Sequence, residues 1–449
     1  MSIEDIFSLS TSTQTWCVCF ILFFLAISVN VHAQRDTTRN TRTNFHFQLT
    51  TVTQHKFDMP APYTGTNSLT TAAEDATTFT STIFWGMKLW KNASLYINPE
   101  ISGGSGISGA HGIADFTNGE AFRVGDPAPK VYLARGFIRQ TFSLSNEDEQ
   151  IEEGPNRIET TRPKKYIMLM VGKFGIADFF DANSYSHDPR SQFFNWGLMS
   201  NGAWDYPANV RGYTWGAVAE YGTPKFKIRA ASVMVPAEAN GNDMDTNFGK
   251  ANSNALEVDV PFRLGQLPGT IRGLAFYTNA HMGNYDLAVE QSPTQPDITT
   301  TRRYSNKYGF GLNVELAIGD HAGLFARASW NDGRNETWAF TEIDRSVSLG
   351  MLASGNSWKR PQDKLGLATV VSGISSHHRD YLAAGGLGFI IGDGALNYSN
   401  EWATEIFYNA NIFHKSFFVT PNYQFVVNPA YNKDRGPANV VGIRVHVEF

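Results

Sequence analysis

Apolar and polar residues alternate along many stretches of about ten residues each, which is the pattern of strands with two unlike faces. The last stretch shows it most clearly, because Val441, Ile443 and Val445 share one face while Gly442 and Arg444 share the other. In a half-buried soluble strand, the charged face would meet bulk water. In a transmembrane barrel, the same face lines a wet lumen and the apolar face meets lipid.

We count about sixteen such segments, and the connectors between them alternate in length. The segments span residues 43–54, 78–91, 93–102, 129–144, 164–174, 211–221, 224–235, 254–263, 270–281, 304–318, 321–331, 345–354, 362–373, 401–412, 416–427 and 438–449. Tight turns fall at Lys91-Asn92 and Gly319-Asp320, whereas 103–128, 175–210, 236–253, 282–303 and 374–400 are long. Short turns on one side and long loops on the other are typical of outer-membrane barrels.

The sequence therefore predicts an all-β fold, a transmembrane antiparallel β-barrel of about 16 strands. Aromatic residues near strand ends are expected in the interfacial girdles: Trp85, Trp90, Tyr132, Tyr221, Trp330 and Tyr408. A soluble sandwich with an ordinary aromatic core is the alternative. The segment 145–163 does not fit, because it is long on the short-turn side, and we interpret it as a solvated acidic loop.

The one long apolar stretch, Trp16–Val29, is too short to span a bilayer, which takes roughly 20 residues. It suits the core of a signal peptide, and Val31-His32-Ala33 follows as a cleavage motif. We expect residues 1–33 to be a signal peptide and 34–449 to form the barrel, with a core helix as the alternative. Both cysteines, Cys17 and Cys19, would be removed, which excludes thiol chemistry in the mature chain.

Composition and motifs argue against a nucleic-acid binder and against an enzyme. The formal net charge is −5, so the basic footprint of a nucleic-acid binder is missing. The chain has no H-E-x-x-H, G-x-S-x-G or P-loop motif. Asp243 and Asp245 lack the Gly and Glu of a calcium-binding EF-hand, and His377-His378 needs further ligands to hold a metal. We therefore expect no catalytic residues, no metal and no cofactor.

One run of motifs resembles the carbohydrate-selective porin family (OprB-like). The run comprises Gly172-Lys173-Phe174, Asp178-Phe179-Phe180-Asp181-Ala182-Asn183, His187-Asp188-Pro189-Arg190, Gln192-Phe193-Phe194-Asn195 and Ala203-Trp204-Asp205-Tyr206-Pro207. Further similarity lies in 212–216, 324–333, 381–394 and the last strands, so that it covers most of residues 165–449.

The resemblance implies an outer-membrane porin of a Gram-negative bacterium that passes mono- or oligosaccharides by passive diffusion. One long loop of such porins folds inward and narrows the lumen, and by position 175–210 is that constriction loop. The family's assembly machinery reads the terminal aromatic residue, here Phe449. Sugars and outer-membrane lipid are then the expected partners, and a homotrimer is a possibility that no sequence feature decides.

A barrel of about 16–18 strands leaves an aqueous channel, whose selectivity depends on width, lining groups and charge. Sugars need hydrogen-bonding groups of both signs and aromatic faces. The candidate pore-lining residues are Arg135, Arg139, Lys173, Arg229, Glu257, Asp259, Glu315, Arg327, Glu401 and Glu405 on the strands, and Asp188, Arg190, Trp196 and Trp204 in the constriction loop. For each of them the alternative is a structural role, either a salt bridge bracing the wall or a loop anchor.

Three rival functions remain open at this point. A general porin for small polar solutes, without sugar preference, is the first. A barrel enzyme would need a catalytic constellation that the sequence does not display. A secreted carbohydrate-binding sandwich would be soluble in buffer without detergent.

Overall fold

A closed antiparallel barrel of sixteen strands forms the body of the protein in the computed structural model. The structure describes residues 42–121, 127–413 and 416–449. Contacts divide the chain into two units, and the barrel unit runs from Thr43 to Glu448. Its strands are β1 (Thr43–Lys56), β2 (Glu74–Lys88), β3 (Ala93–Gly104), β4 (Lys130–Ser143), β7 (Tyr166–Phe174), β8 (Thr214–Gly222), β9 (Lys227–Val233), β10 (Asn252–Leu264), β11 (Leu267–Met282), β12 (Arg303–Ile318), β13 (Ala322–Asn331), β14 (Arg345–Ser354), β15 (Lys364–Gly373), β16 (Glu401–Phe413), β17 (Phe417–Val427) and β18 (Ala438–Glu448). All sixteen predicted segments are therefore confirmed as strands.

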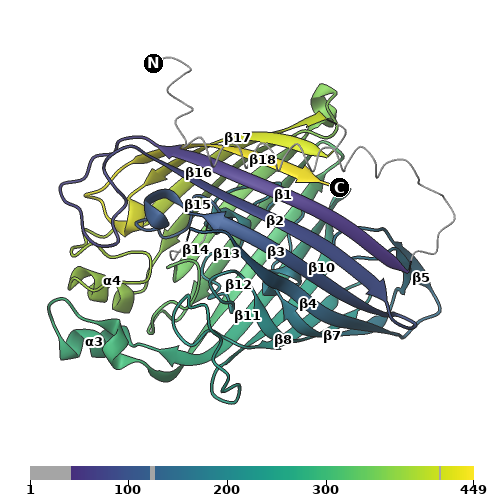
Figure 1. Ribbon diagram of the computed structural model, residues 1–449, viewed down its shortest axis with the longest axis horizontal. Coiled ribbons are helices and arrows are strands. Elements are labelled where there is room, and N and C mark those ends of the chain that lie inside the picture. The colour runs from purple at the N-terminus through teal and green to yellow at the C-terminus, as the bar shows by residue number, and fades with distance from the viewer. Residues whose placement is uncertain (1–41, 122–126, 414–415) are drawn as a thin grey trace. The chain divides into compact units, whose positions relative to one another are not determined.

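The barrel closes where β1 pairs with β18, the purple and yellow strands that lie side by side in Figure 1. Their register sets Val52 opposite Arg444 and Thr50 opposite His446. Each remaining strand pairs with its neighbour along the chain, except that β4 pairs directly with β7. Closure leaves no free edge in the sheet, so every strand finds backbone partners on both sides, as a bilayer interior requires.

The two faces of the strands separate by polarity as the alternation predicts. On β12, Phe310 and Leu312 point outward and are exposed, whereas Asn313 points inward and is 1% exposed. On β16, Trp402 and Ile406 are exposed, whereas Glu401 and Glu405 are buried inside the barrel. Apolar side chains that stay exposed around a closed sheet are expected for a surface that faces lipid.

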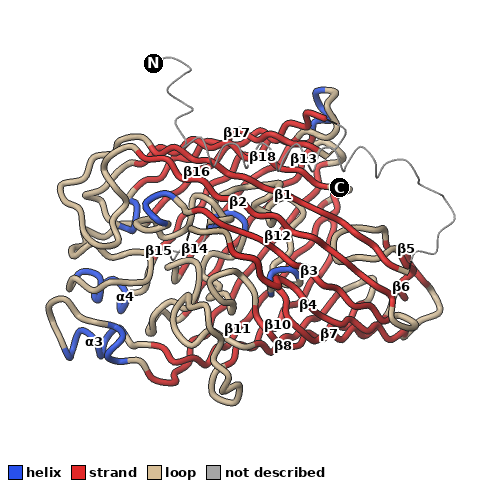
Figure 2. Tube along the Cα trace, viewed as in Figure 1, coloured by secondary structure: helices blue, strands red, loops and turns tan. Residues whose placement is uncertain are grey.

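Connector length follows the prediction as well. Figure 2 shows the long loops gathered at one end of the barrel, with the hairpin of β5 and β6 at the other. The long-loop end carries short helices: η2 (Ile107–Gly109), η3 (Ile176–Asp178), α2 (Trp196–Met199), α3 (Tyr285–Gln291), η4 (Ile298–Thr301), α4 (Ser376–Ala383) and η6 (Pro429–Tyr431). A further turn, η5 (Gly355–Trp358), connects β14 to β15 at the short-turn end. Within the described residues, no helix has the length and apolar character needed to cross a bilayer.

The segment 145–163 differs from the solvated loop that we expected. It forms a two-stranded hairpin, β5 (Asp148–Ile151) and β6 (Thr160–Pro163). Its acidic residues are exposed, as anticipated, but its tip is held by the barrel wall. The Nδ2 atom of Asn44 donates hydrogen bonds to the carbonyl oxygens of Gly154 and Arg157 at 3.1 and 3.2 Å. Each strand of this hairpin has only four residues, and an alternating pattern over so few residues does not distinguish a strand from a loop.

The predicted outward position of Tyr132 is wrong. The pairing of β3 with β4 is irregular at Asn98 and Pro99, which leaves Ala134 without a partner. A bulge of one residue reverses the face of every side chain beyond it. Tyr132 consequently points inward and donates a hydrogen bond to Glu100 at 2.5 Å, whereas Ile138 is exposed outside.

The predicted inward position of Lys173 is also wrong. Lys173 pairs with Trp215, a residue that is 45% exposed. Directly opposed residues of an antiparallel pair share a face, so Lys173 belongs to the outer face of the barrel. The predicted signal peptide, residues 1–33, lies outside the described residues.

Candidate functional site

The 175–213 loop, which connects β7 to β8, folds into the barrel and binds its inner wall. Glu405 on β16 accepts hydrogen bonds from the backbone nitrogens of Phe194 and Asn195 at 2.7 and 2.9 Å. Arg444 on β18 donates to the carbonyl oxygens of Pro189 and Gln192 at 2.6 and 2.8 Å. These bonds join residues about two hundred positions apart in sequence, so the loop is seated by the closed barrel.

The same loop is held on the opposite wall by strands β10, β12 and β13. Asp181 lies 3.1 Å from the Nε atom of Arg327, and its backbone nitrogen donates to Glu257 at 2.7 Å. Ser184 donates its backbone N–H to Glu315 at 2.7 Å. These contacts show that four predicted site residues hold a loop in place, which is the loop-anchor role given as an alternative above: Glu257, Glu315, Arg327 and Glu405.

A second loop, residues 105–121, also folds inward, and the sequence analysis did not identify it. Glu401 accepts the backbone N–H of Ala114 through both carboxylate oxygens, at 3.1 and 3.0 Å. The carbonyl oxygen of Thr117 accepts hydrogen bonds from Gln54 on β1 and Gln424 on β17. The segment 103–128 was recognised only as long, because no residue type distinguishes it from the connectors that stay outside.

The two inward loops contact each other and share a carboxyl pair. Trp196 donates its backbone N–H to the carbonyl oxygen of Phe116 at 2.9 Å. Asp115 faces the carboxyl group of Glu401 and accepts a hydrogen bond from Asn195 at 3.3 Å. Burial raises the pKa of Asp115 to about 6, although the hydrogen bonds act in the opposite direction.

The two predicted tryptophans of the loop are packed. The ring of Trp196 stacks on Phe340 with centroids 4.6 Å apart. Trp204 is 3% exposed and lies against Phe180 and Tyr206. Both belong to the apolar contacts that fix the loop, so neither presents an open ring face.

Arg229 is at the centre of a cluster on β8, β9 and β10. Its guanidinium contacts the carboxylates of Glu220, Glu257 and Asp259. Its side chain is 8% exposed, so the cation is buried among its partners. A buried cation is destabilising unless opposite charges pair with it, and the three carboxylates of the cluster provide this pairing.

The inner face of β3 and β4 carries the polar residues that remain accessible. Arg135 on β4 forms a bidentate pair with Asp178, both bonds being 2.6 Å long. The two side chains are 14% and 28% exposed, compared with 1% and 2% for Arg327 and Asp181. The Arg135–Asp178 pair is thus the more solvent-accessible of the two pairs.

Three guanidinium groups on this side of the barrel each lie over an aromatic ring. Arg139 lies 5.0 Å from the centroid of Tyr96, and Arg135 lies 5.2 Å from that of Tyr213. Arg211, at the end of the 175–213 loop, lies 4.6 Å from the centroid of Tyr132. Cations at such distances are attracted to the ring face.

Arg190 and Glu100 complete the polar surface toward the long-loop end. The guanidinium of Arg190 lies 3.2 Å from Glu100 and 2.9 Å from Glu120. Burial alone would raise the pKa of Asp188, but the charge of Arg190, the positive field of His446 and hydrogen bonds from the Arg190 backbone and Ser191 together outweigh it, so the pKa lies below its usual value. Tyr213 donates to Glu100 at 2.9 Å. Arg190 and Asp188 are therefore charged groups held in place by neighbours.

Sequence reasoning identified Arg135, Arg139 and Arg190 here but missed their partners. Asp178 lies in the family-like run around Phe179 and could have been chosen with it. Tyr213 lies in the similar stretch 212–216 and could have been chosen likewise. Glu100 carried no such indication, because its position follows from pairing across strands. No cluster of three or more potential metal ligands occurs among the residues that the structure describes.

A closed barrel with an apolar exterior, a polar inner wall and two inward loops defines the class of outer-membrane porins. A model of the family "Carbohydrate-selective porin, OprB family" matches residues 66–449. The chain belongs to this family, which confirms the resemblance noted from the sequence.

Individual relatives are distant in sequence but similar in fold. Porin AaxA of Chlamydia abortus is 23% identical over 293 residues, which are 64% of this chain and 55% of that porin, so the match spans about half the length of this relative. OprB of Pseudomonas putida, in its high-pH structure, matches with a TM-score of 0.67 and 15% identity over 91% of this chain and 94% of OprB. The channel DcaP of Acinetobacter baumannii has a TM-score of 0.51 and 9% identity, over 91% and 97% of the two chains. The family and the fold support the prediction of an outer-membrane carbohydrate porin.

Proposed function

We propose that the protein passes mono- and oligosaccharides by passive diffusion along the inner face of β3 and β4. Between the two inward loops and the opposite wall, the polar groups are buried in mutual contacts. On β3 and β4, the accessible groups are Arg135, Arg139 and the residues that accompany them. A solute would meet Arg211 near the long-loop end, then Arg135, then Arg139 near the short-turn end.

The three arginine–ring pairs are the observation that carries this proposal. A sugar has hydroxyl groups around its edge and C–H groups on its ring faces. A guanidinium donates hydrogen bonds in a fixed plane to hydroxyl oxygens. The tyrosine rings beneath hold the guanidinium groups in place, since Tyr96 and Tyr213 are themselves only 3% and 6% exposed. Repeating the pair three times lets a sugar exchange one contact for the next without a deep energy minimum.

The 175–213 loop sets the width of this path in our proposal. Its residues Asp178 and Phe179 lie on the side of β4, where Asp178 binds Arg135 and Phe179 contacts Phe137. Glu257, Glu315, Arg327, Glu401 and Glu405 act as anchors that keep the two loops in place. The protein acts as a channel in this account, with no covalent step.

Liposome swelling distinguishes this function from a general porin. Vesicles containing the protein would be diluted into isotonic glucose, maltose, glycine or lysine, with protein-free vesicles as the control. Faster swelling in maltose than in a smaller amino acid would support sugar preference. Rates that depend only on solute mass would favour a general porin.

We further propose that the terminal Phe449 is recognised by the barrel-assembly machinery. Phe449→Ser is expected to reduce insertion into the outer membrane, measured as the fraction of heat-modifiable protein in outer-membrane extracts. Normal insertion would contradict the assignment. A homotrimer stays a prediction, and cross-linking in detergent tests it.

A further inference from the structure

The β5–β6 hairpin, which connects β4 to β7, reaches along the inner wall at the short-turn end as far as β1. Asn44 on β1 holds the carbonyl oxygens of the hairpin tip, Gly154 and Arg157, at 3.1 and 3.2 Å. Asn98 on β3 donates to the Oδ1 atom of Asn156 at 2.9 Å. The tip is therefore fixed to inward-facing side chains, and a solute must pass beside this hairpin.

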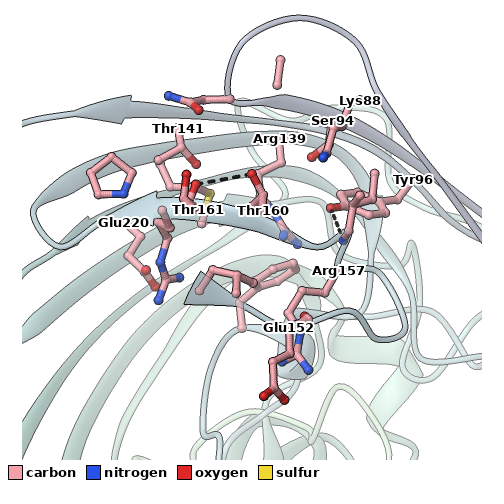
Figure 3. A pocket seen from close by; sticks show the side chains of 18 of the residues that line it. Lys88, Ser94, Tyr96, Arg139, Thr141, Glu152, Arg157, Thr160, Thr161 and Glu220 are labelled. Atoms are coloured by element: carbon pink, nitrogen blue, oxygen red, sulfur yellow. Dashed lines mark hydrogen bonds between the residues drawn. The ribbon is translucent and has the colours of Figure 1, made fainter. Parts of the chain in front are cut away.

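A cavity of about 780 Å³ lies between the hairpin, the wall and the underside of the 175–213 loop. The hairpin contributes Thr160 and Thr161, β4 contributes Arg139 and Thr141, and the loop contributes Phe179. Figure 3 shows Arg139 directed into this space, with Thr160 and Thr161 of the hairpin close to it. Cavities of roughly 300–1,000 Å³ accommodate small organic ligands.

Positive charge predominates in the lining of the cavity. Six cationic side chains and three carboxylates line it, namely Lys88, Arg139, Arg157, Arg162, Lys227 and Arg229 against Glu152, Asp178 and Glu220. Asp178 is occupied by Arg135, and Glu220 by Arg229. Arg162 is paired outside the cavity with Glu149 at 2.6 Å. Two of the three carboxylates in the lining are thus already paired with arginines other than Arg139.

Among the described residues, Arg139 contacts aromatic rings rather than a carboxylate. Its guanidinium lies 5.0, 5.6 and 6.0 Å from the ring centroids of Tyr96, Phe137 and Phe179. Its Nε atom is buried and has no hydrogen-bond partner within the described part of the chain. Aromatic rings stabilise the cation but accept none of its directed hydrogen bonds as a carboxylate does. A buried donor without a partner is destabilising, and an anionic ligand would supply the missing acceptor.

We propose that this cavity is a binding site for sugars that carry a carboxylate, with Arg139 as the group that binds it. The inference rests on the proposed function, because it concerns a solute that has entered the sugar path. The carboxylate accepts hydrogen bonds from the Arg139 guanidinium, and sugar hydroxyls reach Thr141, Thr160 and Thr161. Arg157 at the hairpin tip adds a second cation, since its Nε atom donates only to the carbonyl oxygen of Glu152.

Single-channel recording in planar bilayers tests the site with galacturonate and its neutral counterpart galactose. The concentration that halves the open-channel current would be measured for each sugar on the full-length protein. The variants are Arg139→Gln and Arg157→Gln, with Arg263→Gln as the matched control. Arg263 is an exposed cation at the short-turn end of β10 and does not line the cavity. Heat-modifiable mobility would verify that each variant has formed its barrel.

In the unmodified protein, galacturonate is expected to block at a lower concentration than galactose. Arg139→Gln is expected to raise the half-blocking concentration of galacturonate about tenfold. The half-blocking concentration of galactose should rise by a clearly smaller factor, because galactose loses hydroxyl contacts with Arg139 but has no carboxylate to lose. Arg157→Gln should raise the half-blocking concentration of galacturonate by a smaller factor. This variant tests the site by itself if Arg139→Gln does not fold. Arg263→Gln should match the unmodified protein.

The carboxylate site would be overturned if neither Arg139→Gln nor Arg157→Gln changed the block by galacturonate. If galactose still blocked these channels, the sugar path of the proposed function would stand. Channels that neither sugar blocks would instead contradict the proposed function itself. If Arg139→Gln weakened the block by galacturonate and by galactose to the same degree, the substitution would have changed the pore as a whole. That result would also overturn the carboxylate site.

Discussion

Asp181 and Arg327 form an ion pair at 3.1 Å that joins the 175–213 loop to strand β13 inside the barrel. The two side chains are 2% and 1% exposed. Arg327 also donates to the carbonyl oxygens of Ser186 and Leu198. A single wall residue thus holds three separate points of one loop, which explains how a long connector can keep one position in an aqueous lumen.

Asp181→Ala should loosen the loop, because it leaves the buried cation of Arg327 without its counter-charge. Breaking a buried pair in this way costs about 3–5 kcal/mol. We expect noisier and larger single-channel currents and a lower temperature for the heat-modifiable mobility shift. Asp380→Ala is the control, since Asp380 pairs with Arg379 on the exposed surface of α4, with side chains 64% and 44% exposed. Equal effects of the two variants would contradict the anchoring role.

Arg135→Gln should weaken sugar block, because Arg135 supplies charged donors at the centre of the proposed path. Loss of a hydrogen bond to a charged donor costs about 1.5–3 kcal/mol, which corresponds to at least tenfold in affinity. The measurement is the maltose concentration that halves the open-channel current. Lys225→Gln is the control, because Lys225 is an exposed cation in the turn between β8 and β9. Unchanged maltose block in Arg135→Gln would place the path elsewhere.

The 105–121 loop should be seated more firmly in mildly acid solution than at neutral pH. Burial raises the pKa of Asp115 to about 6, whereas the unfolded carboxyl titrates near 3.9. The contribution of Asp115 is therefore fully present below about pH 4 and is lost as the pH rises through about 6, a change of ~3 kcal/mol. The ionisable groups that face it are Glu401 and Tyr431.

Asp115→Asn tests this dependence, because an amide keeps a donor at the position and cannot ionise. The midpoint of the heat-modifiable shift would be compared at pH 4.5 and pH 7.5 in both proteins. We expect the unmodified protein to lose stability toward pH 7.5 and the variant to lose less. Identical pH profiles would show that Asp115 does not titrate in this range.

Deleting residues 183–205 should widen the channel, because these residues occupy the lumen. The segment carries Phe193, Phe194 and Leu198, all almost completely buried against wall residues and the second loop. Single-channel conductance is expected to increase. Removing residues 246–250, an exposed stretch between β9 and β10, serves as the control. Unaltered conductance after the first deletion would place the narrowest point outside this segment.

Much of the fold could be predicted from local pattern. The alternation of Phe310 and Leu312 with Gly311 and Asn313 defines the two faces of β12 without reference to any other strand. The candidate site was predicted less completely. Arg135, Arg139 and Arg190 were identified, but Asp178, Glu100 and Tyr213 were not. Their roles depend on which strands become neighbours, and single-strand patterns contain no such information.

Two errors show the same limit. Tyr132 was assigned to the outer face because the bulge at Ala134 has no local signature. Lys173 was assigned to the lumen together with the other charged residues of the predicted inner faces. The register with Trp215 instead places it outside, near the end of β7.

By itself, the sequence determined that this chain forms about sixteen strands with one apolar and one polar face, because that pattern repeats every two residues along each strand. Only the tertiary structure decided which loops enter the lumen and which charges remain accessible there. Contacts such as Phe194 with Glu405 join residues more than two hundred positions apart. They exist only after the barrel has closed in one register, since closure alone brings those residues together.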